Sequence, residues 1–178
     1  MSLWFRSYGF ADVHPDLIIG AYPLDEEDVA MIAHLGVDRI LNLVEDSEYR
    51  AGERDAVEPV LEEAEIEEHR LDLTDFGGLP AEELEAAVAL VNEWLDDGHR
   101  VYVHCRAGWQ RSAAIAAGVV AIREGRDIEE ALDVVQVRKP SADPLPHQRE
   151  DLASWWHERT ATAEEHDPDG QPAPPSAD

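Results

Sequence analysis

Cysteine and lysine are almost absent from this chain of 178 residues, which contains one of each, Cys105 and Lys139. A single cysteine excludes an internal disulfide, and it leaves no second thiol that could resolve an oxidised Cys105. Long apolar runs are missing too, so the sequence offers no helix that could span a bilayer. The first ten residues lack the basic region and apolar core of a secretory signal. These absences predict a cytoplasmic protein with no membrane insertion.

Positive charge is also scarce. Fourteen Lys and Arg residues stand against forty Asp and Glu residues, which gives a formal net charge of −26. Nucleic acids and anionic membranes are bound through basic patches, so this balance argues against both as partners. A lysine-poor, acidic composition resembles that of halophile proteins, whose hydrated surface stays soluble in concentrated salt. At ~1 M salt the charges are screened beyond ~3 Å. An ordinary acidic protein is the alternative interpretation.

Hydrophobic patterning predicts strands that alternate with helices. This alternation implies an α/β fold with a central, mostly parallel sheet that is flanked by helices on both faces. We expect one catalytic domain over residues 1–160 and a disordered acidic, proline-rich tail over residues 161–178. The expected strands cover residues 16–20, 37–44, 66–73 and 100–103, and the expected helices cover residues 25–36, 49–64, 80–95, 112–125, 127–139 and 147–159.

The stretch from His104 to Ser112 carries the strongest chemical signal. It holds the only cysteine and, six residues later, Arg111, between a predicted buried strand and a predicted apolar helix. A loop of this kind directs backbone N–H groups at one point and binds phosphate, and the helix terminus lowers the pKa of a nearby thiol. Arg111 can donate two hydrogen bonds to phosphate oxygens. The predicted phosphate-binding residues are Arg106, Ala107, Gly108, Trp109, Gln110 and Arg111.

The pattern His-Cys-x5-Arg-Ser resembles the phosphate-binding loop of the cysteine-dependent protein tyrosine phosphatases, specifically the dual-specificity branch. The resemblance extends over most of the chain and implies a protein tyrosine phosphatase-like fold that needs no metal or cofactor. It implies that Cys105 is the nucleophile and that Arg111 binds phosphate. It also implies that His104 orients the loop and helps to stabilise the thiolate, and that Ser112 stabilises the thiolate as it leaves phosphorus.

Three features depart from patterns in this superfamily. Trp109 and Gln110 stand where small or modest polar residues are common, and we expect Trp109 to pack against a neighbouring loop rather than to stack on a substrate. The basic pair that marks phosphoinositide phosphatases is missing, because only Arg106 is present. The pocket-deepening loop of the longer, tyrosine-specific phosphatases is also missing, so the pocket should be shallow.

A general acid is expected on the glycine-rich segment of residues 71–80, which we call the Asp75 loop. In dual-specificity phosphatases the acid lies roughly thirty residues before the cysteine, and both Asp75 and Asp72 are near this distance. Asp72 falls within the alternation of the preceding strand, whereas Asp75 precedes a Phe-Gly-Gly turn. We favour Asp75, because catalytic groups are commonly carried by loops on a rigid scaffold.

The resemblance implies a dual-specificity phosphatase that hydrolyses phosphotyrosine and phosphoserine or phosphothreonine through a phosphocysteine. Its partners would be phosphorylated proteins or small phosphate esters, and its oligomeric state stays open. A phosphatase for lipid, sugar or nucleotide phosphates would carry the same residues and remains an alternative. A rhodanese-like sulfurtransferase and a phosphopeptide-binding pseudophosphatase are weaker alternatives, because the former needs no general acid and the latter should lack a catalytic residue.

Overall fold

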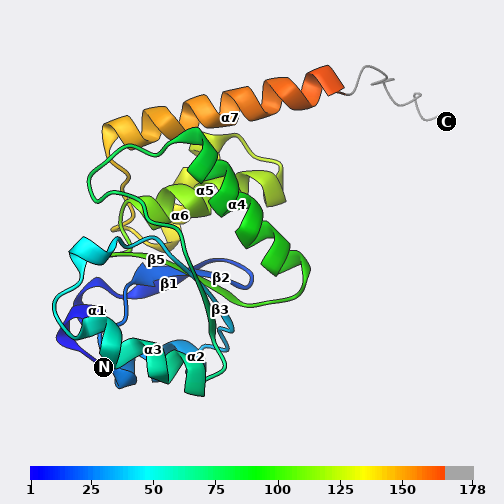
Figure 1. Cartoon of the computed structure of the whole chain (residues 1–178). Helices are drawn as coiled ribbons and strands as arrows, with labels where there is room; N and C mark the ends of the chain where they lie inside the picture. The colour runs from blue at the N-terminus through cyan, green and yellow to red at the C-terminus, as the bar shows by residue number, and fades with distance from the viewer. Residues whose placement is uncertain (167–178) are drawn as a thin grey trace.

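Five strands form a single sheet in this computed structural model, which describes residues 1–166 (Figure 1). The strand order is β1-β2-β5-β3-β4. Strand β1 pairs antiparallel with β2, and all other neighbouring strands are parallel, so the expected mostly parallel sheet is confirmed. The strands are β1 (Phe10–His14), β2 (Leu17–Ala21), β3 (Arg39–Asn42), β4 (Glu67–Arg70) and β5 (Val101–Cys105).

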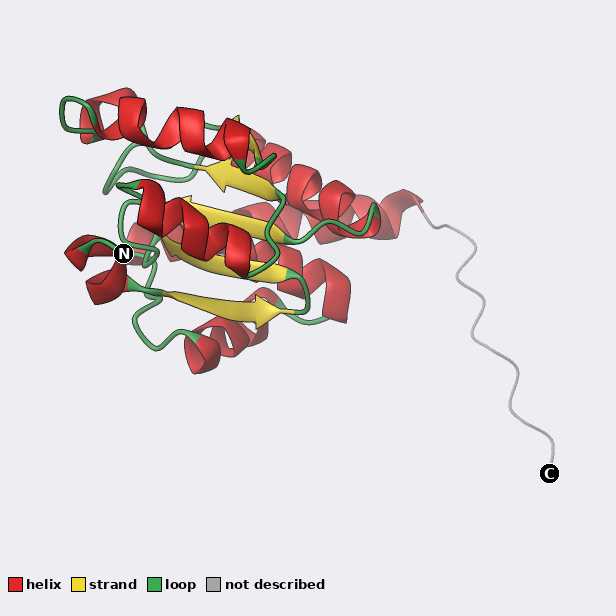
Figure 2. Ribbon diagram, turned by 90° about the horizontal axis from the view of Figure 1, so that it is seen from below, coloured by secondary structure: helices red, strands yellow, loops and turns green. Residues whose placement is uncertain are grey.

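Helices cover both faces of the sheet, as Figures 1 and 2 show. Helices α1, α2 and α3 lie against one face, and α4, α5, α6 and α7 lie against the other. A short 3₁₀ turn, η1 (Asp46–Glu48), follows β3. The helices are α1 (Leu3–Tyr8), α2 (Glu26–His34), α3 (Glu53–Glu63), α4 (Ala81–Asp96), α5 (Arg111–Glu124), α6 (Ile128–Arg138) and α7 (Pro146–His166).

Strand β5 lies at the centre of the sheet and contributes to both apolar cores. Every residue of β5 is buried. Because successive side chains of a strand point to opposite faces, Tyr102 packs with α1, α2 and α3, whereas Val101, Val103 and Cys105 pack with the other four helices. The C-terminal residue of β5, Cys105, is therefore held by a rigid, fully buried strand.

The structure adds three elements that the hydrophobic pattern did not predict, α1, β1 and η1. The side chain of Ser2 caps α1 and also donates to the buried carboxylate of Asp28 in α2. The polar helix expected over residues 49–64 begins only at Glu53, because Gly52 precedes it in a left-handed conformation. These differences change the edge of the sheet and leave its centre as predicted.

Helix α7 is longer than expected at its C-terminus. It continues to His166, so residues 161–166 are helical where the sequence had indicated the start of a disordered tail. Ala and Glu, which are strong helix formers, dominate residues 161–165, and the first proline after them is Pro168. The rest of the expected tail, residues 167–178, lies outside the described residues.

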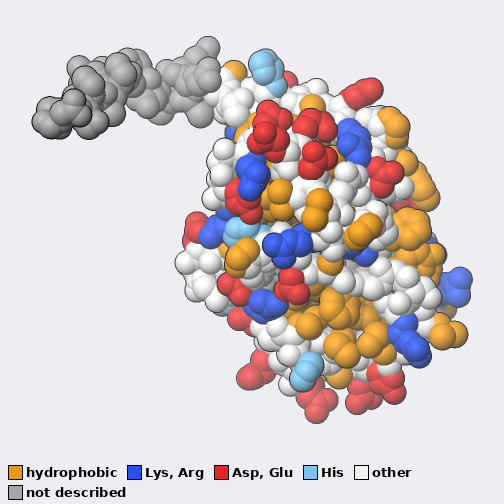
Figure 3. Space-filling model, turned by 180° about the vertical axis from the view of Figure 1, so that it is seen from behind, with side chains coloured by type: hydrophobic (Ala, Val, Ile, Leu, Met, Phe, Trp, Pro, Cys, Tyr) orange, Lys and Arg blue, Asp and Glu red, His pale blue; other side chains and the backbone are white. Residues whose placement is uncertain are grey.

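The surface is acidic, in keeping with the composition. Figure 3 shows acidic side chains spread over one face, with a group of hydrophobic side chains between them. Among residues 1–166, none of the helices combines the length and the apolar character needed to cross a membrane.

Candidate active site

The Cys105 loop (residues 105–111) connects the end of β5 to the first turn of α5. Its centre is Gly108, which has a φ of +72°, a left-handed conformation that favours glycine. A Cβ at this position would lie 2.5 Å from the carbonyl carbon of Gly20, at the end of β2. The loop therefore lies directly on the backbone of the neighbouring strand, and only glycine fits at the point of contact.

The backbone N–H groups of this loop remain available to a ligand. Those of residues 107–109 have no hydrogen-bond partner in the part of the chain that the structure describes. They lie beside the N-terminus of α5, whose dipole adds a partial positive charge. Unpaired N–H groups at a helix N-terminus form a binding site for anions, phosphate among them.

The environment of Cys105 stabilises its thiolate. Burial alone would raise the pKa of the thiol. The guanidinium of Arg111, the hydroxyl of Ser112 and the N–H groups of Ser112 and Gln110 outweigh that effect, so the pKa lies below its ordinary value. The Cys105 Sγ and Ser112 Oγ atoms are 3.4 Å apart. The structure thus brings the predicted nucleophile and the predicted serine together.

Arg111 is buried, with 1% of its side chain exposed, and most of its donors are already paired. Nη1 donates to Glu48 Oε1 at 2.6 Å and to the carbonyl oxygens of Leu43 and Leu73. Nη2 donates to Glu48 Oε2 at 2.8 Å and to Asp75 Oδ1 at 2.9 Å. Nε is buried with no partner among the described residues. A buried, unpaired guanidinium N–H is costly, so the Nε edge is prepared for an anionic acceptor.

Glu48 is a site residue that the sequence analysis missed. Its carboxylate forms a bidentate pair with Arg111, and only 7% of the Glu48 side chain is exposed. It lies in η1, where its side chain also accepts from the Glu45 backbone in a capping box. The pair fixes the plane of the guanidinium. One of forty acidic residues, 63 positions from its partner, could not be selected without the fold.

The structure separates the two candidate acids. Asp75 is partly buried, accepts a hydrogen bond from Arg111 and lines the same cavity as Cys105. Asp72 is exposed, pairs with Arg70 and lines a different cavity, on the side of α7. Of the two carboxylates, Asp75 is the one positioned to reach an ester bound over the thiolate, and its role as the acid stays a prediction.

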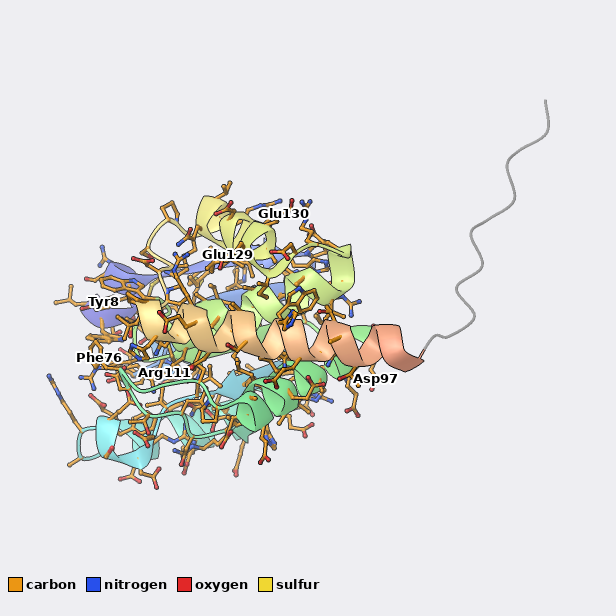
Figure 4. The ribbon with its side chains drawn as sticks, turned by 90° about the horizontal axis from the view of Figure 1, so that it is seen from above. Tyr8, Phe76, Asp97, Arg111, Glu129 and Glu130 are labelled. Carbon is orange, nitrogen blue, oxygen red and sulfur yellow. The ribbon has the colours of Figure 1, made fainter. Side chains whose placement is uncertain are left out.

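A cavity of about 360 Å³ opens above the Cys105 loop. Figure 4 shows Tyr8, Phe76 and Arg111 at one end of the molecule, far from Asp97 at the other end. Phe76 is 67% exposed and Trp109 is 40% exposed, so the cavity has an aromatic rim. An apolar substituent next to the phosphate would contact these rings.

One wall of the cavity comes from α1. Trp109 packs against Tyr8 with ring centroids 5.1 Å apart, so its packing partner is helix α1 and not the neighbouring loop that was expected, and Tyr8 packs in turn against Trp4. Behind this wall lies Lys139, whose Nζ donates to the Tyr8 carbonyl at 2.8 Å and to Ser141 Oγ at 3.1 Å. Burial lowers the pKa of Lys139, which is 5% exposed.

His104 and Arg106 flank Cys105 in the chain and have different surroundings. Burial lowers the pKa of His104 to about 3, so the imidazole is neutral near pH 7 and brings no positive charge to the thiolate. Its ring nitrogens have no hydrogen-bond partner among the described residues. The Arg106 guanidinium donates to the Glu48 carbonyl and stacks over Trp4. Arg106 also lines the cavity above Cys105.

Comparison with known proteins yields consistent matches. The family model described as "Dual specificity phosphatase, catalytic domain" matches residues 17–158. Phosphatidylglycerophosphatase and protein-tyrosine phosphatase 1 of Mus musculus is 28% identical over 148 residues, which cover 83% of this chain and 76% of that protein. The protein of the same name from Homo sapiens is 26% identical over 152 residues, which cover 85% of this chain and 75% of that protein.

Solved structures share the fold. The structure of PTPMT1 in complex with PI(5)P superposes with a TM-score of 0.75 at 24% identity and covers 86% of this chain and 98% of that chain. The active form of Tk-PTP superposes with a TM-score of 0.71 at 24% identity and covers 83% of this chain and 96% of that chain. At this level of identity the likeness supports the arrangement of the sheet and helices.

Proposed function

The chain belongs to the dual specificity phosphatase catalytic-domain family, and we propose that it hydrolyses phosphate monoesters through a phosphocysteine formed on Cys105. One observation carries the proposal. The unpaired Nε of Arg111 lies buried beside a thiol whose pKa is lowered, next to N–H groups that donate to no oxygen of the described residues. A phosphate dianion would satisfy all of these donors at once and place phosphorus over the sulfur atom.

In the first step the Cys105 thiolate attacks phosphorus, and the bond from phosphorus to the ester oxygen breaks. The N–H groups of the Cys105 loop and Arg111 stabilise the charge on the equatorial phosphate oxygens. Asp75 donates its proton to the departing oxygen, so that an alcohol or phenol leaves. Because Asp75 pairs with Arg111 in the structure, a bound phosphate replaces it there and frees the carboxyl group to face the ester oxygen.

In the second step water attacks the phosphocysteine. The Asp75 carboxylate, now deprotonated, accepts a proton from this water. The oxygen atom of the water becomes part of the inorganic phosphate that leaves. The Cys105 thiolate is released, and the Ser112 hydroxyl, 3.4 Å from the sulfur, stabilises it by hydrogen bonding. Charge and protons balance over the two steps.

For the substrate we propose phosphotyrosine and phosphoserine or phosphothreonine in proteins. The aromatic rim formed by Phe76 and Trp109 supports a substrate with an aromatic or apolar group next to the phosphate. A phospholipid monoester is the second candidate, because the curated relatives are named as both phosphatidylglycerophosphatase and protein-tyrosine phosphatase. The same rim would contact the apolar part of a lipid.

Trapping of the intermediate tests the chemistry. Rapid acid quench during turnover of a ³²P-labelled phosphotyrosyl peptide should leave label on the protein, and Cys105→Ala should leave none. Absence of label together with absence of phosphate release would overturn the proposal. Thiosulfate-to-cyanide sulfur transfer without phosphatase activity would favour a sulfurtransferase, and peptide binding without turnover would favour a pseudophosphatase.

A substrate comparison tests the specificity. The kcat/KM values for phosphotyrosyl and phosphoseryl peptides should exceed that for phosphatidylglycerophosphate in mixed micelles. The reverse order would reject the protein substrates and favour the lipid. Low and high salt should both be used, because the highly acidic surface responds to ionic strength.

A further inference from the structure

We propose that Gln148, near the start of α7, is a positioning residue that fixes the Asp75 loop over the Cys105 thiolate. The inference rests on the function proposed above and assigns a part of it to a helix that contributes no residue to the cavity above Cys105. Gln148 is fully buried although it is polar, and it is 73 positions from Asp75 in the chain. A buried amide at this place needs both of its polar ends satisfied.

Both ends of the Gln148 amide are paired. Nε2 donates to the carbonyl oxygen of Gly77 at 2.9 Å, and Oε1 accepts from the N–H of Leu145 at 3.1 Å. An amide can donate only from nitrogen and accept only through oxygen, so these two partners define its orientation. Gly77 follows Asp75 by two residues, and its carbonyl also accepts from the exposed His147 ring at 3.0 Å.

A second contact from α7 holds the next turn of the loop. Asp151 Oδ2 accepts from the N–H of Leu79 at 2.7 Å. A Cβ at Gly78 would lie 3.0 Å from the same carboxylate oxygen, so the loop and the helix are in close contact. One turn of α7 thus binds the C-terminal half of the Asp75 loop through two backbone atoms.

The N-terminal side of the Asp75 loop is held independently. The N–H of Leu73 donates to the carbonyl of Leu43 at 3.3 Å, and the carbonyl of Leu73 accepts from Arg111 at 2.6 Å. Asp75 therefore lies in a short span between two fixed points, Leu73 and Gly77. Loss of the Gln148 contact leaves Gly77 with the exposed His147 ring as its partner from α7, so the span that carries Asp75 gains freedom up to Leu79, which Asp151 still holds.

The segment that carries Gln148 also contacts the nucleophile loop. The N–H of Asp143 donates to the carbonyl oxygen of Trp109 at 2.7 Å. Residues 143–151 therefore bind both catalytic loops, the Cys105 loop at Trp109 and the Asp75 loop at Gly77 and Leu79. This segment sets the separation between the thiolate and the acid, which has to match one phosphate ester.

Gln148→Met tests the role, because methionine keeps the length of the side chain and removes both hydrogen bonds. The kcat/KM value reports formation of the phosphocysteine, the step in which the leaving group needs a proton. We expect kcat/KM for phosphoserine to fall between about 10- and 100-fold, the range that a misplaced catalytic group produces. The value for p-nitrophenyl phosphate should change little, because nitrophenolate leaves without a proton.

Gln136→Met is the matched control. Gln136 lies in α6, is partly exposed and makes no side-chain hydrogen bond to the described residues, so both substrates should react as with the wild type. A merely structural defect would lower both kcat/KM values of Gln148→Met by the same factor, and that result, or no loss at all, would overturn the proposal. If Gln148→Met does not fold, Gln148→Asn, whose shorter amide cannot span the distance to the Gly77 carbonyl, makes the same comparison.

A double-mutant cycle with Asp75→Asn tests whether Gln148→Met lowers kcat/KM through Asp75. Once the acid is gone, adding Gln148→Met should cause no further loss on phosphoserine, whereas additive losses would reject the inference. Failure of the proposed function would give a different result from failure of this inference. In that case the wild type hydrolyses neither substrate, or the Asp75→Asn loss itself shows no dependence on the leaving group.

Discussion

Gly108→Ala tests how tightly the Cys105 loop is packed on the sheet. The added Cβ would lie 2.5 Å from the carbonyl carbon, 2.6 Å from the carbonyl oxygen and 2.7 Å from the Cα of Gly20. These are backbone atoms of β2, which is hydrogen-bonded on both sides in the sheet. Because that backbone cannot rotate away as a side chain could, the Cys105 loop has to shift by about 0.9 Å to reach the 3.4 Å of ordinary contact.

The expected loss of stability in Gly108→Ala follows from comparison with Gly125→Ala. Gly125 ends α5 with a φ of +62°, close to the +72° of Gly108, and a Cβ there would meet nothing within 4 Å. A left-handed alanine costs roughly 1–2 kcal/mol of stability, which is the whole expected effect at Gly125. At Gly108 the steric overlap adds about 1–3 kcal/mol, so the expected loss is about 2–5 kcal/mol.

Urea unfolding at one pH and salt concentration measures both losses. Activity should separate the variants further, because a shift of about 1 Å in the N–H groups that we propose to bind phosphate should lower kcat/KM by about 100-fold. Gly125→Ala should keep wild-type kcat/KM. If Gly108→Ala is as stable and as active as Gly125→Ala, the loop does not rest on β2 as described, and the reasoning is refuted.

Four further predictions concern the chemistry and the charge. Asp75→Asn should lower kcat/KM about 100-fold on an alkyl phosphate and much less on p-nitrophenyl phosphate. Asp72→Asn should not do so, and the reverse pattern would assign the acid to Asp72. Cys105→Ser should abolish turnover and keep vanadate binding, and activity above about a thousandth of wild type would contradict a covalent thiolate. The pKa of His104 is about 3 in the folded protein and near 6.5 when unfolded, so the unfolded state binds an extra proton between these values. Stability should therefore fall by about 1.4 kcal/mol per pH unit as the pH drops from 6.5 toward 3. His104→Leu should remove that part of the slope in urea titrations, and an unchanged slope would refute a neutral buried imidazole. Lowering salt from ~1 M to ~0.01 M stretches the Debye length from ~3 to ~30 Å and should lower Tm, and a Tm that stays constant or rises would exclude a halophile-type surface.

The parts of the site that are local in sequence were predictable. Cys105, Arg111 and Ser112 lie within eight consecutive residues, and a strand, a loop and a helix N-terminus arrange them without help from the rest of the chain. The match to the dual specificity phosphatase catalytic domain confirms the family that this stretch resembles. The parallel core of the sheet was predictable too, because the alternation of strands and helices is visible in the local hydrophobic pattern.

The parts that depend on long-range contacts were not predictable. Glu48 reaches Arg111, and Gln148 reaches Gly77, only because the sheet brings three separate loops to one edge. Neither residue stands out in composition or periodicity. Helix α1 was missed because it has only six residues, too few to show a helical repeat, and because its stability depends on Asp28. The sequence favoured Asp75 over Asp72 as the acid, and the fold adds that Asp75 lines the cavity of Cys105 whereas Asp72 lines another.

The burial of Lys139 has a practical consequence for work on this protein. Its ε-amine is the only one in the sequence, and it donates to the carbonyl of Tyr8 behind the cavity wall. Acylating reagents, amine-coupled dyes and enzymes that modify lysine find no exposed side-chain amine on the folded chain. Acylation of Lys139 requires α1 to move away first. The rate at which this amine is labelled therefore reports how often α1, which carries Tyr8 and Trp4, moves away from Lys139.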